Sequence, residues 1–442
     1  ELDAGTELAR TIWSHAELGY MEEKSSAALQ SFLTERGFSI ETAVAGMPTA
    51  FIASSGRGQP VIGVLAEFDA LPGMSQAATP VRQPLSKDGG GHACGHHLFG
   101  AASATAGVAV ARWLEATGRS GTVRVYGTPA EEGGSGKVYL TRAGLFDDVD
   151  VVLHWHPGDS NSAAAATTTA NKSGRFTFHG IAAHAAAAPD RGRSALDGVE
   201  AMNYMVNLMR EHMPSDARIH YVITNGGAAP NIVPETAQVY YYVRHPDAQR
   251  VISLFERVVR AAEAGALGTD TTMDYEVMHG NYAVLPNETL ARLVDDNLRG
   301  FGGFLYNDSE RQFARDIRQT LSGKLPPIDA TNQIQPFAFT QSMGSTDVGD
   351  VSWNVPTVGF TTATWVPGTP AHSWQAVAAG GTSIGFKGMH LAAKLLARTA
   401  RDLIENPELI VEARQELQRR RGKDFEYRAL LGDREPPLDY RR

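Results

Sequence analysis

The stretch VIGVLAEFDALPG, residues 61–73, decides the fold class. Residues 61–68 are a short apolar run that ends in acidic residues, and Leu-Pro-Gly follows it. An apolar run of this length, bounded by turn residues, is typical of a strand buried inside a sheet. We therefore predict a buried strand that leads into a loop carrying Glu67 and Asp69.

Two similar runs follow along the chain, TVRVYGT at 122–128 and VDVVLHW at 149–155. An Ala-rich segment at 98–116 has helical character and separates the first two of these strands. Alternation of strands and helices predicts an α/β core with a largely parallel sheet. Active-site groups of such sheets lie at the carboxyl ends of the strands. The polar residues found there are Glu67, Asp69, Glu131, Glu132 and His156.

A change of character marks a second domain. Residues 161–170 (NSAAAATTTA) are small and polar, as expected where the chain crosses between domains. Strands of alternating polarity then precede a long helix at 194–212 and a strand at 238–243. The sequence therefore predicts a second domain inserted at residues 171–280. The catalytic domain is predicted to consist of residues 1–170 and 281–442.

Composition restricts the function classes. The 442 residues carry a formal net charge of -9, which argues against nucleic acid as a partner. No apolar run reaches the roughly 18 residues that a membrane span needs, so no membrane partner is expected. A cytoplasmic location is expected, although an export signal trimmed from the chain would leave no trace. The charged stretch 414–442 is predicted to be a solvated helix and tail.

The densest chemical signal is GHACGHH at residues 91–97. Three imidazoles and the only thiol of the chain, Cys94, lie within six residues. A thiolate and an imidazole two residues apart can reach one metal ion from a loop that opens a helix. The helix amino terminus would also favour the thiolate.

Three further motifs supply donors. In PAEEGG, residues 129–134, one of the adjacent carboxylates Glu131 and Glu132 can bind metal while the other moves protons. In HWHP, residues 154–157, either His154 or His156 can be a ligand because both share a face of an extended chain. GTPAHS, residues 368–373, places His372 in a Gly/Pro loop.

Together, these motifs supply enough donors for a site with two metal ions. Cys94, His96, one Glu, one strand-end His and His372 make five ligands. Two metal ions that share a bridging group require about that many and leave a place for water. The remaining carboxylate of the Glu pair would then be the base.

The order and spacing of these motifs resemble the aminoacylase and carboxypeptidase G family of metallohydrolases. The similarity is greatest to the branch with the auxin-conjugate amidohydrolases and enzymes of the aminobenzoyl-glutamate type. That branch carries HACGH, PAEEGG, a strand-end His and a late His. The wider family has His-x-Asp after the early strand, whereas this chain has Glu67-Phe68-Asp69, so that ligand is missing. GSTDVGD at 344–350 also departs from the common Ser-Glu-Asp-Phe text and looks like the aminobenzoyl-glutamate type.

The resemblance implies a two-domain metallopeptidase fold in which residues 171–280 form an α+β lid and dimerisation domain. It implies that two divalent ions, zinc or manganese, bind each chain and that Cys94 bridges them. The other ligands would be His96, Glu132, His156 and His372, and Glu131 would be the general base. His184, in GIAAHA at 180–185, would stabilise the oxyanion in the partner subunit of a homodimer.

The same resemblance implies the substrate contacts. Asn231, in the GGAAPNIVP motif at 226–234, would lie near the active site, and Arg244 would hold the substrate carboxylate. The expected reaction is hydrolysis of the amide bond in N-acyl or N-aroyl amino acids, including conjugates of the aminobenzoyl-glutamate kind. The metals would polarise the carbonyl and acidify a water, whose proton Glu131 would take.

Three alternatives stay open at the level of sequence. The chain could be a dipeptidase or another deacylase, such as a desuccinylase, of the same fold. It could also be a non-catalytic metal-binding or receptor-like protein, against which the Glu131 carboxylate speaks. A third alternative is a hydrolase with Cys94 as nucleophile, activated by His92 or His97. That alternative would leave His156, His372 and the Glu pair without a role.

Overall fold

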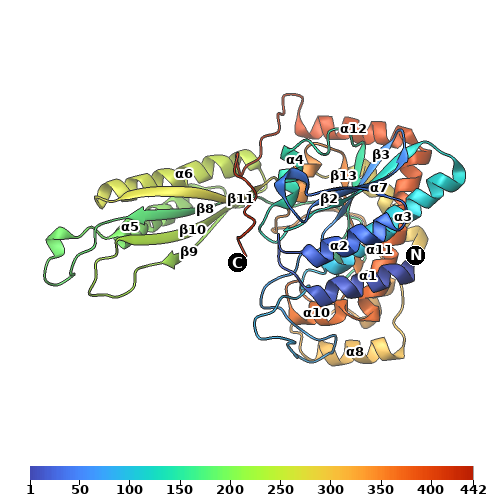
Figure 1. Ribbon diagram of the computed structural model, residues 1–442, viewed down its shortest axis with the longest axis horizontal. Coiled ribbons are helices and arrows are strands. Elements are labelled where there is room, and N and C mark those ends of the chain that lie inside the picture. Colours follow the sequence, from blue (N-terminus) through green and yellow to red (C-terminus); the bar gives the residue numbers. More distant parts are fainter. Residues whose placement is uncertain (442) are drawn as a thin grey trace.

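The computed structural model describes residues 1–441 and shows a large body joined to an elongated smaller one (Figure 1). A six-stranded sheet with the order β1-β2-β4-β3-β5-β13 forms the centre of the large body. The bounds of these strands are β1 Ser39–Thr42, β2 Phe51–Arg57, β3 Val61–Ala66, β4 Gly121–Gly127, β5 Val151–Leu153 and β13 Thr357–Val358.

The predicted α/β class with a mostly parallel sheet is confirmed. Strand β3, buried along its whole length, pairs in parallel with β4 and β5, and β13 pairs in parallel with β5. The antiparallel pair β1 and β2 forms one edge of the sheet. Because β3 has helices or strands on every side, its sequence is continuously apolar and does not alternate.

Helix α3 (His96–Thr117) packs on β3 and β4. Its small residues allow a close approach: a Cβ added at Gly107 would lie 2.5 Å from Val125 of β4. The other helices of this body are α1 Leu2–His15, α2 Glu23–Thr34, α4 Gly136–Arg142, α7 Glu288–Phe301, α8 Asp308–Arg318, α9 Val348–Ser352, α10 Trp374–Gly380, α11 Ser383–Glu405 and α12 Pro407–Arg421. None of the helices within residues 1–441 is long and apolar enough to cross a membrane.

Two small parallel pairs complete the strands of the large body. Strand β6 pairs with β14, and β7 pairs with β12. Their bounds are β6 His156–Gly158, β7 Ala165–Thr167, β12 Phe339–Gln341 and β14 Thr361–Ala363.

The smaller body consists of an antiparallel sheet with the order β11-β8-β10-β9 and two long helices packed against it (Figure 1). Its elements are β8 Ala170–His179, α5 Ala195–Met209, β9 Arg218–Asn225, β10 Thr236–His245, α6 Ala248–Gly268 and β11 Thr272–Asn281. Alternate side chains of β10 are buried, as expected for a sheet covered on one face. Strand β9 lies at the edge of the sheet and is almost wholly exposed.

The expectation that residues 414–442 form a solvated helix and tail is wrong for the described residues after the helix. Leu430 and Leu431 are buried, and the hydroxyl of Tyr427 donates to Asp350 at 2.7 Å. The chain then continues to the junction between the two bodies, where its end lies in Figure 1. The stretch is rich in charged residues, but it also contains a few apolar and aromatic side chains. These side chains pack against the rest of the protein.

Candidate metal centre and active site

The candidate site lies at the carboxyl ends of β3, β4 and β5. Glu67 follows β3 directly, Glu131 and Glu132 follow β4, and His156 begins β6 just after β5. The loop before α3 brings Cys94 to the same place. Neighbouring parallel strands end at one edge of the sheet, so residues distant in sequence meet there.

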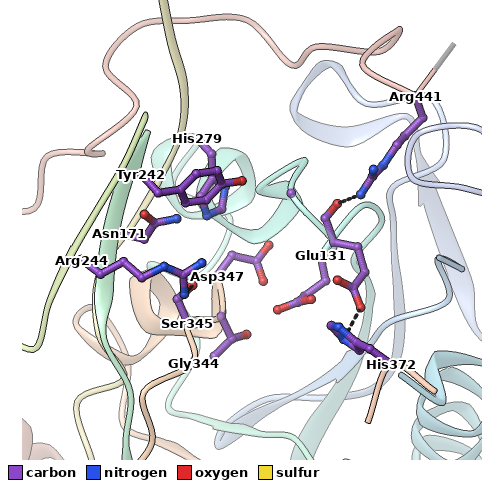
Figure 2. Close-up of a pocket in the computed structure, with 13 residues that line it drawn as sticks. Glu131, Asn171, Tyr242, Arg244, His279, Gly344, Ser345, Asp347, His372 and Arg441 are labelled. Atoms are coloured by element: carbon purple, nitrogen blue, oxygen red, sulfur yellow. Dashed lines mark hydrogen bonds and ion pairs between the residues drawn. The ribbon is translucent and has the colours of Figure 1, made fainter. Parts of the chain in front are cut away.

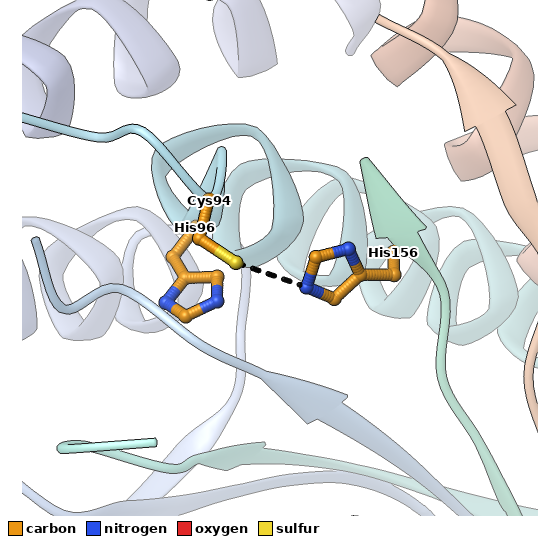
Figure 3. A group of neighbouring side chains, drawn as sticks. All are labelled: Cys94, His96 and His156. Carbon is orange, nitrogen blue, oxygen red and sulfur yellow. Dashed lines mark hydrogen bonds between the residues drawn. The ribbon is translucent and has the colours of Figure 1, made fainter. Parts of the chain in front are cut away.

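Cys94, His96 and His156 form one group of possible metal ligands, shown in Figure 3. One donor atom of each lies within 4.8 Å of the others, and the Cys94 Sγ is 3.5 Å from the His156 Nε2. The loop before α3 depends on Gly95, whose φ of +78° favours glycine. A Cβ there would lie 2.6 Å from Pro157, so the close approach also requires glycine.

Buried carboxylates orient the imidazole of His96. Its Nδ1 lies 2.8 Å from Asp69, which also accepts a hydrogen bond from the backbone N–H of Glu132 at 2.9 Å. Its Nε2 lies 3.0 Å from Glu67. A carboxylate on one ring nitrogen fixes the orientation and raises the basicity of a ligand histidine. The arrangement therefore presents the His96 Nε2 to the centre of the site.

A second group shares the thiol. One donor atom each of Cys94, Glu132 and His372 also lies within 4.8 Å of the others. The same is true of His96, Glu131 and Glu132. The His372 Nε2 is 3.2 Å from Glu132. His372 adopts a left-handed φ of 57°, and its backbone N–H donates to the carbonyl of Ala93 at 3.0 Å. This bond joins the late loop to the loop that carries Cys94.

Unsatisfied polar atoms show that this site fits metal ions. The side-chain atoms His96 Nε2, Glu67 Oε2 and Glu132 Oε1 are buried and make no hydrogen bond within residues 1–441. His96 Nε2 and Glu67 Oε2 lie 3.0 Å apart, and Glu132 Oε1 lies 3.2 Å from His372 Nε2, but neither contact has the geometry of a hydrogen bond. Buried polar groups normally have partners, and orphaned ones at one point indicate a missing ion or water. The donor set of thiol, imidazole and carboxylate suits zinc and related divalent ions.

The charges of the site favour cations as well. Burial, with the nearby Glu67 and Glu132, raises the pKa of Glu131 well above its usual range. Burial also raises the pKa of the Cys94 thiol. Burial lowers the pKa of His96, but the negative charges of Cys94 and the two carboxylates beside it outweigh burial and raise it. Bound cations would favour the ionised forms of Glu131 and of the Cys94 thiol, which burial alone disfavours.

A buried lysine was not recognised from the sequence. The Lys137 ammonium, fully buried at the start of α4, pairs with Glu67 at 2.7 Å and with Asp347 at 2.8 Å. Burial lowers the pKa of Lys137, but these two carboxylates raise it above its usual value, so it stays charged. Lys137 therefore neutralises part of the acidic cluster. It also fixes Glu67 beside His96.

Two cavities meet at the Glu pair. One, of about 570 Å³, is largely apolar and runs from Cys94 to residues such as Phe99, Ala165, Val284, Pro286 and Phe360. The other, of about 320 Å³, lies at the junction with the smaller body and is polar (Figure 2). Glu131, Glu132 and His372 line both. An apolar space, which the candidate ligands Cys94 and His156 also line, and a polar space therefore adjoin at the Glu pair and His372.

Of the three residues of the smaller body that the sequence analysis named, one reaches the polar cavity. Arg244 of β10 lines the polar cavity, and its Nη1 donates to the Ser345 hydroxyl at 3.3 Å. His184 and Asn231 are exposed, and the backbone of Asn231 accepts from Ala185 beside His184. In the described part of the chain, neither lines a cavity next to Glu131.

The geometry argues against Cys94 as a nucleophile. The ring nitrogens of His92 and His97 interact with the carbonyls of Ile12 and Gly380, each at 3.1 Å, and not with the thiol. Burial lowers the pKa of His92 to about 3 and that of His97 well below its usual range. His154, the other histidine of the strand end, lines the apolar cavity and belongs to none of the ligand groups found in residues 1–441.

The fold and the donor set define a metal-dependent hydrolase, and comparison with known proteins gives its family. Residues 63–376 match the model of peptidase family M20/M25/M40, and the chain belongs to this family. It is 42% identical to one of the subunits of the p-aminobenzoyl-glutamate hydrolase of Escherichia coli, over 93% of this chain and 92% of the relative. It is 32% identical to a mouse Xaa-Arg dipeptidase, over 92% of this chain and 88% of the relative.

Solved structures share the fold. A dinuclear metal-binding peptidase of this family from Bacillus subtilis superposes with a TM-score of 0.60 at 18% identity, over 92% of this chain and 99% of that one. An aminobenzoyl-glutamate utilization protein from Klebsiella pneumoniae gives a TM-score of 0.63 at 17% identity, over 90% and 95%. The resemblance inferred from the motifs, to the family and to the aminobenzoyl-glutamate type, is confirmed.

Proposed function

We propose that this protein hydrolyses the amide bond of N-acyl or N-aroyl amino acids, including conjugates of the aminobenzoyl-glutamate kind. The observation that carries the proposal is the pair of cavities that meet at Glu131. The apolar one suits an acyl or aroyl group, and the polar one, with Arg244, suits the amino acid. The name of the Escherichia coli relative describes a substrate of this composition.

Two divalent ions, zinc or manganese, would bind the ligand groups. Cys94 belongs to two of these groups, which supports a bridging role. His96 and His156 would complete one site, and Glu132 and His372 the other. When bound, the ions would polarise the scissile carbonyl and lower the pKa of a water molecule. Glu131 lines both cavities beside the ligand groups, and it would be the general base that accepts a proton and passes it to the leaving amine.

The substrate test separates this proposal from the dipeptidase alternative, which the name of the mouse relative supports. The metal-loaded protein should hydrolyse N-benzoyl-glutamate, and release of benzoate can be followed by chromatography. Hydrolysis of unblocked dipeptides ending in Arg should be much slower, because their charged amino terminus would have to enter the apolar cavity. A preference for the dipeptides would overturn the proposal.

We further propose that residues 171–280 act as a lid and as the dimerisation domain. The edge strand β9 exposes Tyr221, Val222 and Ile223, and unpaired strand edges are ready surfaces for pairing. His184, exposed and outside the chain's own cavities, would then reach the partner's site and stabilise the oxyanion. Asn231 would lie beside it. Because the name of the Escherichia coli relative describes one subunit of a larger enzyme, association with a different chain is the competing arrangement.

Complementation tests this arrangement. His184→Ala and Glu131→Gln homodimers should each be nearly inactive. A mixed dimer has one site with an intact Glu131 opposite an intact His184, so activity should return to a fraction of the wild-type value. Mass spectrometry of the mixture should verify subunit exchange. Verified exchange without recovery of activity would rule out catalysis by His184 across subunits.

A further inference from the structure

We propose that the C-terminal segment, residues 422–441, completes the substrate site and that Arg441 binds a second carboxylate of the substrate. The preferred leaving amino acid would therefore have an acidic side chain. This inference rests on the proposed function and specifies its substrate class. It is carried by two arginines of the polar cavity, Arg244 and Arg441, that pair with no carboxylate within residues 1–441.

The C-terminal segment is held at the junction of the two bodies. Arg142 donates to the carbonyls of Gly432 and Arg434, both at 2.8 Å, and the Arg434 side chain pairs with Glu276 of β11 at 2.7 Å. The segment therefore contacts both the catalytic body and the lid. At Tyr440 and Arg441 it reaches the Glu pair.

Tyr440 and Arg441 fix the end of this path. The Tyr440 hydroxyl and the Arg441 Nη2 both donate to the backbone carbonyl of Glu132, at 3.0 and 2.6 Å. The Tyr440 ring packs edge-on against Tyr20, with centroids 5.7 Å apart. A guanidinium has five N–H donors, so this single bond leaves Arg441 most of its capacity to bind an anion.

Figure 2 places Arg441 and Arg244 on opposite sides of the polar cavity. Neither makes an ion pair with a carboxylate of residues 1–441. The Nε of Arg244 and both polar atoms of the Asn171 side chain are buried and find no hydrogen-bond partner among the described residues. Asn171 is only 1% exposed and lines this cavity, so its amide is available to a ligand.

The acidic residues that face the cavity make no ion pair with Arg244 or Arg441 in residues 1–441. Asp347 pairs with Lys137, and Glu132 lies against His372. Glu131 remains, but Arg244 contacts the Ser345 hydroxyl and Arg441 contacts the backbone carbonyl of Glu132 instead. Two separate guanidiniums fit a ligand with two carboxylates: Arg244 with Asn171 would take one, and Arg441 the other. A guanidinium binds a carboxylate through two parallel hydrogen bonds, which gives both strength and orientation.

The test compares N-benzoyl-glutamate with N-benzoyl-glutamine, which has nearly the same shape but lacks the second charge. Wild type should have the higher kcat/KM on the glutamate compound. Arg441→Gln should reduce the ratio of the two kcat/KM values by roughly 10- to 100-fold, the size expected for a lost charge-assisted contact. The loss should appear mainly in KM, and Arg441→Lys should restore part of the ratio.

Arg428→Gln is the matched control, because this side chain of the same segment is 81% exposed and pairs with Glu426. It should leave the ratio unchanged. If Arg441→Gln lowers both kcat/KM values equally, Arg441 only anchors the segment and the inference is wrong. If wild type cleaves neither compound, the proposed function itself fails, so the two failures are distinguishable.

Discussion

Glu131→Gln is expected to lower kcat by roughly 10² to 10⁴-fold, the usual contribution of a general base. The amide keeps the shape of the carboxylate but cannot accept a proton. Glu131 is half-buried at the point where the apolar and polar cavities meet, so its side chain would adjoin the scissile bond. Steady-state kinetics on N-benzoyl-glutamate, together with elemental analysis, measure the effect.

The neighbouring Glu132→Gln variant is the control. Glu132 lies in two ligand groups and beside His372, so its replacement should weaken metal binding and not the proton transfer alone. Glu131→Gln should keep its metal content and its melting temperature. Loss of metal from Glu131→Gln, with metal retained by Glu132→Gln, would show that the two roles are assigned the wrong way round.

Cys94→Ala should abolish metal binding and turnover together. The thiol is the one donor shared by the Cys94–His96–His156 and the Cys94–Glu132–His372 groups, so its loss affects both sites. Elemental analysis after gel filtration and an activity assay measure the two effects on the same sample.

His154→Gln is the matched control for Cys94→Ala, because His154 is a half-buried histidine near the site that belongs to no ligand group in residues 1–441. It should keep both metals. A Cys94→Ala protein that retains wild-type turnover would contradict the bridging role.

Local sequence was sufficient for the parts of the site that follow strand ends. A continuous apolar run followed by polar residues predicts a strand of a parallel sheet with chemistry at its end, and β3, β4 and β5 behave in this way. The two strand-end histidines show the limit of that reasoning. Period-two alternation places His154 and His156 on one face, but β5 ends at Leu153 and a new strand begins at His156. Only His156 faces Cys94.

Two contacts between residues distant in sequence were not predicted. Lys137 meets Asp347 from 210 residues away, and a single lysine after a Gly-rich loop carries no pattern that indicates burial. Arg441 lies 309 residues from Glu132 in a charged stretch, which by composition alone predicts solvent exposure. In both cases the partner is set by the tertiary fold. The apolar and aromatic side chains Tyr427, Leu430 and Tyr440 were the available signal that the C-terminal segment docks.

The central claim, metal-dependent hydrolysis of an acyl amino acid, is tested most directly by restoring metal to the stripped protein. The protein is first treated with a chelator, and zinc or manganese is then added in steps while N-benzoyl-glutamate hydrolysis is followed. The account predicts no turnover at the start and an increase that saturates at two bound ions per chain by elemental analysis. Full turnover in the chelator-treated protein, with no ion bound, would contradict it.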